Sequence, residues 1–396
     1  MNTPSDEAGV VAAIDDARAS NTPLRVIGND SKAAMLRPVQ AARTLSTAGL
    51  TGITLHAPKE LIVSARAGTT MAELAAVVLS ENQHIICEPP DLTALLGGAS
   101  APTLGGAVAA NLSGPRRVAW GAMRDHVMGI RAVNGSGEVI RSGGRVLKNV
   151  TGLDLCKLLT GSHGTLAVMT EITLKVLPVP ERRATLVLRG LDPVRAVAAL
   201  SKALGSPYAV SGAAHLPADA AARVPALAWA NAAVTLARIE DFAPSVAYRS
   251  GRLRDELRMF GDAELLDDGV SQSVWASVRD ALPLVGLEGA VWRVSVRPSA
   301  GPAVAAAVEA AGCTWFMDWG GGLIWIAGPA DAATHAAISR AAGSGTFTLL
   351  RAPDALRTAV AVVPPEPAPL ARLSRAVKAS FDPAFILNPG RIHAGL

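Results

Sequence analysis

Glycine and other small residues gather in residues 87–180 of this 396-residue chain, between runs typical of β-strands. They occur in TLGGAVAANLSG (103–114), NGSGE (134–138) and GSHGT (161–165), where ionisable side chains are few. Glycine lets a backbone adopt left-handed conformations and come close to a ligand. The segment therefore predicts a backbone-lined cradle for a large, phosphate-bearing ligand, rather than an assembly of acid, base and nucleophile.

The length of the chain favours two domains, because single hydrophobic cores rarely grow beyond about 250–300 residues. Residues 166–180 (LAVMTEITLKVLPVP) predict one or two long strands ended by prolines, which marks a domain boundary. Residues 1–180 are expected to form one domain, completed by a C-terminal tail of residues 365–396. Residues 181–364 alternate strand and helix patterns, which indicates a second α+β domain with helices packed on one face of an antiparallel sheet.

Composition argues against several other classes of protein. Half of the chain is hydrophobic and 18% is charged, but no apolar run reaches the roughly 18 residues of a membrane-spanning helix. The N-terminus carries acidic residues, unlike a secretory signal. The net charge of +4 comes from dispersed basic residues rather than from a patch that would bind nucleic acid. We therefore expect a cytoplasmic protein with no nucleic-acid partner and no direct membrane insertion.

The cysteines and histidines point to no metal site. Cys87, Cys156 and Cys313 are widely spaced and include no CxxC pair, which argues against a disulfide framework and against zinc or iron–sulfur ligation. The seven histidines show no ligand spacing. Three free thiols fit a reducing compartment.

The turn of residues 28–32 (GNDSK) follows a predicted strand, PLRVI. Its backbone N–H groups could converge on a phosphate oxygen, with the Ser31 hydroxyl and the Lys32 ammonium as further donors. An ordinary turn would use the same residue types. Both interpretations stay open on the residues alone.

The motif of residues 103–114 combines close backbone approach with short polar side chains. Gly105 and Gly106 would admit a ligand to the backbone, and Asn111 and Ser113 would supply hydrogen bonds. A small-residue helix packed tightly against another element is the alternative.

The glycines of residues 161–165 repeat this logic. Gly161 and Gly164 bend the chain, and the strand after them could present its backbone to an adenine edge. His163 lies between them without a nucleophile or acid nearby in the sequence, so we interpret it as a turn histidine rather than as a catalytic one.

These motifs, with EPP (88–90), KNVTGLDL (148–155) and LNPGR (387–391), together resemble the FAD-binding domains of the vanillyl-alcohol oxidase/p-cresol methylhydroxylase (PCMH) family. More narrowly, the chain is similar to the E subunits of bacterial glycolate oxidases. The motifs that carry this similarity are CEPP, GPRR and KNVTG and, in the second domain, WRVSVRP and DWGGGLIWI. The resemblance implies a PCMH-type, two-subdomain FAD-binding domain followed by a cap domain. It also implies noncovalent FAD, because no histidine in the first turn is placed for covalent attachment.

The resemblance assigns cofactor contacts to four groups of residues. The pyrophosphate would be bound by the turns of Gly28, Asn29, Asp30, Ser31 and Lys32 and of Thr103, Leu104, Gly105 and Gly106. The ribityl and flavin region would be lined by Asn111, Ser113, Gly114, Gly121 and Asp125, with Pro90 of the EPP turn included in the set. The adenosine half would contact Gly164 and Val168, and Asn388, Gly390 and Arg391 would return beside the flavin ring.

Substrate contacts are less well indicated. Strand alternation in WRVSVRP would put Arg293, Ser295 and Arg297 on one face, where the two arginines could clamp a carboxylate. A solvated sheet face is the alternative. No residue is identified as the catalytic base.

The resemblance implies a subunit that oxidises glycolate, a small 2-hydroxy acid, to glyoxylate and passes electrons to an acceptor other than oxygen. Its partners would be a D-like FAD subunit and an iron–sulfur F-like subunit, and any association with the inner face of the membrane would be made through them. The histidine-rich metal-binding motif of the D subunits is missing from the second domain. A non-catalytic flavoprotein scaffold or electron-relay subunit is therefore the alternative function.

Overall fold

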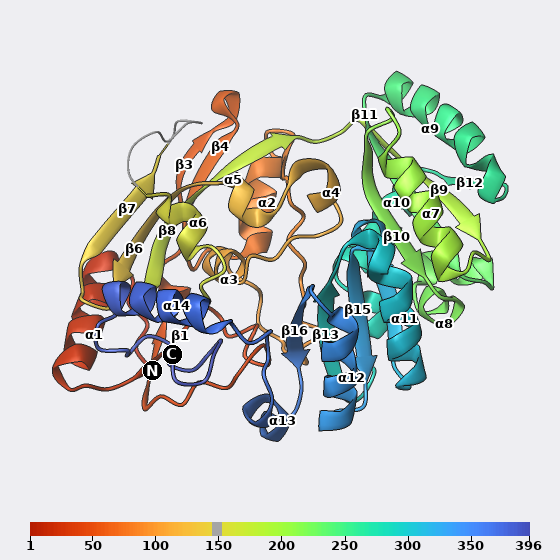
Figure 1. Ribbon diagram of the computed structural model, residues 1–396. Helices are drawn as coiled ribbons and strands as arrows, with labels where there is room; N and C mark the ends of the chain where they lie inside the picture. Colours follow the sequence, from red (N-terminus) through yellow and green to blue (C-terminus); the bar gives the residue numbers. More distant parts are fainter. Residues whose placement is uncertain (145–152) are drawn as a thin grey trace.

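The computed structural model describes residues 1–144 and 153–396 and arranges them around three β-sheets (Figure 1). The KNVTG part of the sequence motif, residues 148–152, lies outside the described residues. A parallel pair joins β1 (Leu24–Ile27) to β2 (Arg43–Ser46). An antiparallel sheet has the order β3 (Ile53–Ala57), β4 (Ile62–Arg66), β8 (Ala167–Pro178), β6 (Val127–Asn134) and β7 (Val139–Gly143), with β5 (Gln83–Ile85) also paired to β8.

The third sheet has eight antiparallel strands and lies on the right of Figure 1. Its order is β12 (Glu264–Leu266), β9 (Arg182–Arg189), β11 (Val234–Asp241), β10 (Val210–Leu216), β14 (Thr314–Asp318), β15 (Leu323–Gly328), β13 (Ala290–Ser295) and β16 (Thr346–Arg351). These helices and antiparallel sheets give the α+β fold class that the sequence predicts.

The helices divide between the two parts of the chain. Those that accompany the first two sheets are α1 (Glu7–Ala19), α2 (Met71–Leu79), α3 (Leu104–Ala109), α4 (Arg117–Trp120), α5 (Met123–His126), α6 (Leu155–Leu159) and α14 (Ala368–Phe381). Those that accompany the eight-stranded sheet are α7 (Pro193–Leu204), α8 (Ala218–Ala222), α9 (Ala243–Leu257), α10 (Asp268–Arg279), α11 (Gly301–Ala310), α12 (Ala332–Ala342) and α13 (Asp354–Ala359). No helix in either described range is both long and apolar enough to cross a membrane.

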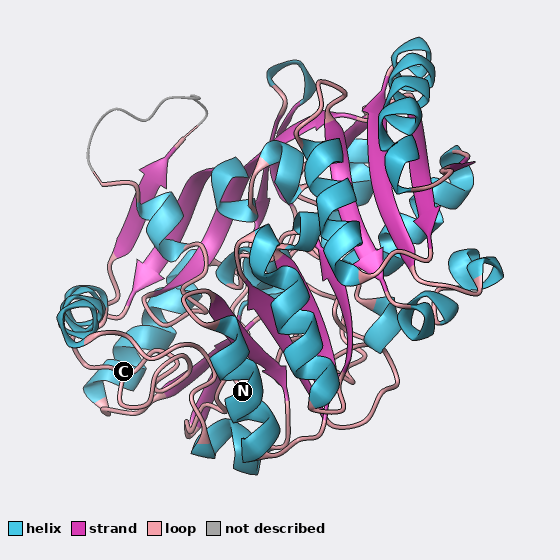
Figure 2. Cartoon of the chain, turned by 45° about the vertical axis from the view of Figure 1, so that its right-hand side comes forward, coloured by secondary structure: helices cyan, strands magenta, loops and turns pink. Residues whose placement is uncertain are grey.

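Helices cover both faces of the eight-stranded sheet, which corrects the one-face prediction (Figure 2). Ala237 of β11 packs in one hydrophobic cluster with residues of α7 and α9. The next residue, Arg238, points to the opposite face, where its guanidinium lies 4.7 Å from the ring of Trp275 on α10. The Trp275 ring also packs against Gly212 of β10. A side chain at position 212 would not fit, because an added Cβ would lie 2.9 Å from the ring.

The hairpin predicted at residues 134–138 is confirmed by the antiparallel pairing of β6 with β7. The Asn134 side-chain oxygen accepts hydrogen bonds from the backbone N–H groups of Ser136 and Glu138, both at 2.9 Å. Such local bonds are the reason that asparagine favours turns.

The C-terminal tail returns to the N-terminal part, as Figure 1 shows for α14 beside α1 and β1. Leu387 forms a parallel bridge with Leu24 of β1, and Leu24 donates a backbone hydrogen bond to Ile386 at 2.7 Å. The buried Lys378 ammonium donates to Asp382 at 2.7 Å and to the Leu387 carbonyl at 2.8 Å. Because both charges are paired inside the protein, the tail is fixed against the first two sheets.

A buried ion cluster joins the N-terminal part to the eight-stranded sheet. We define it as Glu88, Arg116, Arg183, Arg238 and Glu240. The Glu240 carboxylate, with a fully buried side chain, accepts from Arg116 at 2.7 Å and lies 3.2 Å from Arg238 and 3.4 Å from Arg183. Arg238 also donates to both oxygens of Glu88, at 2.8 and 3.1 Å. Each charged group of the cluster is paired with at least one group of opposite charge. The cluster therefore fixes the position of the N-terminal part against the eight-stranded sheet.

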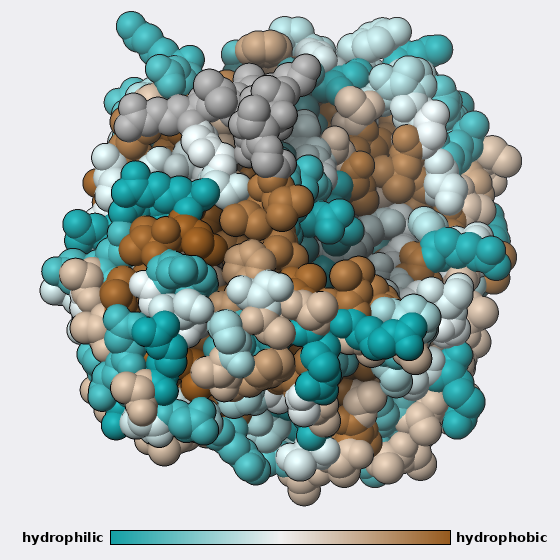
Figure 3. Space-filling model, turned by 60° about the vertical axis from the view of Figure 1, so that its left-hand side comes forward, coloured by the Kyte–Doolittle hydropathy of each residue, from teal (hydrophilic) through white to brown (hydrophobic). Residues whose placement is uncertain are grey.

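Apolar side chains also reach the surface on the side drawn in Figure 3. A groove there is lined by Leu158 and Leu166 from the region of α6 and by Leu373 and Val377 of α14. Leu158 is 37% exposed and Leu373 is 60% exposed. An exposed cluster of this kind is typical of contact surfaces.

Candidate cofactor site

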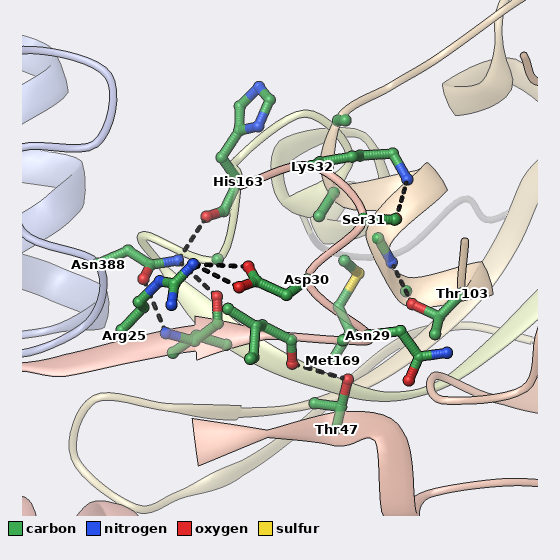
Figure 4. A pocket seen from close by; sticks show the side chains of 18 of the residues that line it. Arg25, Asn29, Asp30, Ser31, Lys32, Thr47, Thr103, His163, Met169 and Asn388 are labelled. Carbon is green, nitrogen blue, oxygen red and sulfur yellow. Dashed lines mark hydrogen bonds and ion pairs between the residues drawn. The ribbon is translucent and has the colours of Figure 1, made fainter. Parts of the chain in front are cut away.

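A cavity lies at the end of β1, between the first sheet, α3 and the C-terminal tail (Figure 4). Four segments far apart in the sequence meet there. They are the turn of residues 28–32, the start of α3, the turn of residues 161–164 and the tail residues Asn388 and Arg391.

The turn of residues 28–32 presents unused backbone donors. Among the described residues, none accepts a hydrogen bond from the backbone N–H groups of residues 29–32. Asp30 has a left-handed φ of 59°, and its carboxylate receives two hydrogen bonds from Arg25, at 2.7 and 2.6 Å. Alternating conformations of this kind create concave sets of N–H groups that bind anions. The Arg25–Asp30 pair holds the turn in that shape.

The start of α3 supplies shape rather than donors. Its first backbone N–H groups are already bonded, Leu104 to the Thr69 carbonyl and Gly105 to the Ala67 carbonyl, both within 2.9 Å. The Thr103 hydroxyl accepts the Gly106 N–H at 3.2 Å. The phosphate donors indicated by the geometry are therefore those of the preceding turn.

Glycine is required where this turn meets α3. A Cβ on Gly28 would lie 2.3 Å from the Thr103 hydroxyl oxygen, which is closer than real Cβ atoms come. The Thr103 side chain packs directly against the backbone at this position, and this close approach explains the glycine.

Two cations face the cavity. Burial lowers the pKa of Lys32 to about 8, with Asp91 opposing the shift, and the Lys32 ammonium lies 3.3 Å from the Ser31 hydroxyl. Burial, with the nearby Arg357 and Arg25, lowers the pKa of Arg391 to about 10. The Arg391 guanidinium donates to the carbonyls of Arg37 and Lys32, both at 2.9 Å, so it also orients the loop after the turn. A desolvated cation is stabilised by an anionic ligand.

Asn388 connects three segments around the cavity. Its side-chain oxygen accepts the Val26 N–H at 2.8 Å, and its amide nitrogen donates to the Val26 carbonyl at 3.1 Å and to the His163 carbonyl at 2.8 Å. A Cβ on Gly164 would lie 2.9 Å from this nitrogen. The tail thus holds β1 and the 161–164 turn at a fixed separation.

His163 lines the cavity from a left-handed backbone, with φ of 52°. Burial, reinforced by Arg391 and Lys32, lowers the pKa of its imidazole to about 3. The ring is therefore neutral at pH 7. The charged groups that act on this pKa are both cations, in keeping with the interpretation as a turn histidine.

The free N–H groups, the two cations and the glycine cradle fit the pyrophosphate of a dinucleotide. Of the residues that the sequence assigned to the cofactor, more than half line this cavity. They are Gly28, Asn29, Asp30, Ser31, Lys32, Thr103, Gly105, Gly106, Gly164, Asn388 and Arg391.

Other assigned residues lie behind or beside the cavity. Leu104 is fully buried in the core, Pro90 is buried, and Gly390 lines a separate surface hollow with Arg37. Val168 packs with α1, because β8 places its neighbours Ala167 and Met169 on the cavity side. The assignment in this strand is thus displaced by one residue, which turns a side chain to the other face.

The residues assigned to the flavin region form a second group near α4 and α5. The Asn111 side chain accepts the Arg124 N–H at 3.2 Å, and the Ser113 hydroxyl accepts the Met123 N–H at 2.9 Å. The Asp125 carboxylate accepts the Ala122 N–H at 2.8 Å beside Gly121. Gly114 reaches the eight-stranded sheet, since its carbonyl accepts the Trp319 indole N–H at 3.1 Å. These residues are not part of the cavity lining.

Sequence reasoning missed several lining residues, chiefly Arg25, Thr47, Ala109 and Met169. Two of them had a usable signal. Met169 follows from strand alternation once the register of β8 is known, and Ala109 continues the small-residue run of α3. Thr47, which donates to the Ile27 carbonyl at 3.2 Å, belongs to a segment that no motif marked.

The predicted two-arginine clamp is not formed. Arg293 lies within β13 and is partly buried, whereas Arg297 lies beyond the last strand residue, Ser295, and is exposed. Strand alternation therefore does not extend to Arg297.

Comparison with known proteins agrees with this geometry. Residues 2–143 match the family model described as FAD binding domain. The fold resembles that of p-cresol methylhydroxylase with substrate bound, with a TM-score of 0.74 over 99% of this chain and 88% of that one, at 13% identity. These two matches define a protein with an FAD-binding domain and the PCMH-type fold.

Two curated relatives narrow this class. The glycolate oxidase subunit GlcE of Escherichia coli (strain K12) is 34% identical over 97% of this chain and 96% of its own length. The glycolate oxidase subunit GlcD of Bacillus subtilis (strain 168) is 40% identical over 25% of this chain and 20% of its own length. The chain belongs to the family of the glycolate oxidase subunit GlcE, as the sequence motifs predict.

Proposed function

We propose that this chain is the FAD-binding E-type subunit of a complex that oxidises glycolate, or a similar small 2-hydroxy acid, to the 2-oxo acid. Electrons would leave through a D-like flavoprotein and an iron–sulfur subunit to an acceptor other than oxygen. The observation that carries the proposal is the cavity of free N–H groups, Lys32 and Arg391, in a chain that matches GlcE over nearly its whole length.

The cofactor would be held by the residues of the cavity. FAD, when bound, supplies the hydride acceptor for the oxidation of an alcohol carbon. The turn of residues 28–32 would bind its pyrophosphate, with the ammonium of Lys32 beside it. Noncovalent binding remains our prediction, and Asn388 would keep the walls of the site at the required separation.

The apolar groove between α6 and α14 supports the assembly part of the proposal. Two of its lining residues, Leu158 and Leu373, are 37% and 60% exposed, and a contiguous exposed apolar surface of this kind marks contact sites. A partner subunit that covers this groove would remove them from water.

A second candidate function is a flavoprotein scaffold or electron relay without its own substrate. It is favoured by the residues assigned to the flavin region, where the carboxylate of Asp125 accepts the Ala122 N–H at 2.8 Å and so is engaged in capping α5. In this case a D-like partner would oxidise the acid.

Anaerobic reduction distinguishes the two candidates. The purified, FAD-loaded chain is mixed with glycolate in the absence of oxygen, and the visible absorbance of the flavin is followed. Loss of absorbance in the isolated chain supports oxidation at its own flavin. Loss that requires the D-like and iron–sulfur partners supports the relay, and no loss in the complete mixture contradicts the proposed substrate class.

A further inference from the structure

Arg293 and Asp318 project from the same face of the eight-stranded sheet. Arg293 of β13 is paired with Trp325 of β15, and Trp325 is paired with Phe316 of β14. Asp318 lies two residues beyond Phe316 and so points the same way. Trp292, the neighbour of Arg293, points to the other face, where its indole N–H donates to His335 on α12 at 3.2 Å. The Arg293 face is therefore the one turned away from α12.

Arg293 lacks the partners that the other buried arginines of this face have. Within residues 1–144 and 153–396 its guanidinium makes no hydrogen bond or ion pair, and its Nε atom is fully buried without a partner. Arg238, by contrast, is bonded to Glu88 and lies beside Glu240. Leaving a buried donor unsatisfied costs about 1–3 kcal/mol. A ligand that accepts hydrogen bonds would remove this cost.

Aromatic rings hold the Arg293 guanidinium in place. Its central carbon lies 4.8 Å from the Trp319 ring centre and 5.7 Å from that of Trp325. The Arg117 guanidinium lies 4.3 Å from the same Trp319 ring. Two cations on one indole, with no carboxylate bonded to either among residues 1–144 and 153–396, form a strongly electropositive position. An anion is the ligand that such a position attracts.

The position adjoins the residues assigned to the flavin region. The Trp319 indole N–H is bonded to the carbonyl of Gly114, and the Arg293 guanidinium lies over the same ring. Arg293 is partly buried, and of its guanidinium nitrogens only Nε is a fully buried atom without a partner, so the terminal nitrogens are the ones open to a small molecule.

Asp318 neutralises the charge of Arg293 only in part. Its carboxylate accepts the Trp319 N–H at 2.7 Å, and no ion pair joins it to Arg293 in the described part of the chain. Burial raises the pKa of Asp318 to about 7, and the opposing effects of Arg238 and Arg293 are smaller. Near neutral pH a good part of Asp318 is therefore protonated and carries no charge.

We propose that Arg293, held between Trp319 and Trp325, binds the carboxylate of a small carboxylic acid. That this acid is the 2-hydroxy acid substrate rests on the proposed function, whereas the anion site itself rests on the contacts of Arg293. A planar guanidinium matches a carboxylate with two parallel hydrogen bonds, a geometry that lysine cannot reproduce.

The test uses oxalate, a small dicarboxylate without an oxidisable hydroxyl group. Oxalate is titrated into the FAD-loaded full-length chain, and binding is followed by calorimetry and by the flavin spectrum. Wild-type protein is expected to bind oxalate, Arg293→Met to bind it at least tenfold more weakly, and Arg293→Lys to lie between them. The control is Arg340→Met, an exposed arginine of α12, which is expected to match wild type.

Folding is checked independently through FAD content and thermal unfolding. If Arg293→Met does not fold, Arg293→Lys carries the test, since it keeps the charge and loses the bidentate geometry. Wild-type affinity in the folded variants, or no oxalate binding by wild type, overturns the proposal. A changed flavin reduction potential with unchanged oxalate affinity also overturns it, because the anion at Arg293 would then be the flavin itself.

Failure of the proposed function gives a different pattern. Suppose that oxalate binding depends on Arg293 but glycolate reduces the flavin in no mixture. This result supports the anion site and contradicts the proposed substrate class. If Arg293→Met oxidises glycolate with an unchanged KM, the proposed function is supported and the carboxylate site at Arg293 is contradicted.

Discussion

The side chain of Asn388 bonds both backbone polar groups of Val26, a residue 362 positions earlier in the chain. The two bonds, of 2.8 and 3.1 Å, imitate the pairing of a neighbouring strand at the point where β1 ends. A single side chain thus extends the edge of the cofactor cavity, and it also fixes the turn that contains His163.

Substitution of this residue is expected to affect both stability and cofactor content. Asn388→Ala leaves three backbone groups without their partner, which should lower the free energy of unfolding by about 1–3 kcal/mol. FAD content should fall as well, because β1 and the 161–164 turn lose their common contact. Thermal unfolding and the absorbance ratio of flavin to protein measure the two effects. Gln272→Ala, an exposed amide of α10, is the matched control and should change neither.

Gly28→Ala is expected to prevent FAD binding without unfolding the chain. The added Cβ would lie 2.3 Å from the Thr103 hydroxyl oxygen, in the space between the 28–32 turn and α3. Equilibrium binding of FAD to the apoprotein checks this. In the control Gly251→Ala, the new Cβ meets nothing within 4 Å in α9, and stability should be equal or higher because alanine favours the helix by roughly 0.5–1 kcal/mol. Normal FAD affinity in Gly28→Ala would show that the ligand does not approach this turn.

The affinity for FAD should fall as the pH rises through about 8. The Lys32 ammonium, whose pKa burial lowers to about 8, loses its charge in this range, so the attraction to the pyrophosphate weakens. Arg391, with a pKa of about 10, stays charged there, and His163, with a pKa of about 3, stays neutral. Lys32→Met should weaken FAD binding roughly tenfold at pH 7 and remove the pH dependence near 8. Lys59→Met, an exposed residue, should keep both, and a pH dependence that survives Lys32→Met would assign it to another group.

The buried ion cluster should make stability depend on acidic pH. Although burial raises the pKa of Glu240, Arg238 and Arg116 hold it well below its ordinary value of 4.5. The cluster's contribution is therefore complete above pH 4.5 and is lost as the pH falls toward the pKa of the folded state. Glu240→Ala should lower the free energy of unfolding by about 3–5 kcal/mol at pH 7, because it leaves buried guanidinium groups unpaired.

Denaturant titrations of wild type and variant at several pH values measure this effect. Glu264→Ala is the control, since its 3.6 Å pair with Arg189 is solvent-exposed and should contribute less than about 1 kcal/mol. Equal losses in the two variants would contradict a special role for the cluster.

The sequence predicts the local parts of this fold and site well. The turn of residues 28–32, the hairpin at Asn134 and helix α7 depend on glycine, asparagine and apolar spacing within a few residues, so they can be recognised from the residues alone. The residues of this turn and of the start of α3 that line the cavity can be recognised in the same way, because their glycines and short polar residues are adjacent in the sequence.

Features that depend on distant partners were not predictable. Strand β10 (VSGAAHL) has glycine and two alanines at its centre, where strands usually carry β-branched or aromatic residues, and the Trp275 ring packed against Gly212 accounts for the glycine. The register of β8 determines that Met169, rather than Val168, lines the cavity. This register depends on the pairing of β8 with β6 and β4. The partnerless state of Arg293 could not be seen before the sheet order brought Trp319 and Trp325 beside it.

The return of the tail to β1 has a consequence for biosynthesis. A ribosome releases Leu24 and the 28–32 turn early, but Ile386, Leu387 and Asn388 emerge more than 350 residues later. Until then β1 lacks the neighbour that closes one side of the cavity. We therefore expect FAD to be acquired only after residues 386–388 have emerged, and a nascent chain stalled before residue 386 to retain no flavin, although it already contains the whole segment that matches the FAD-binding family model.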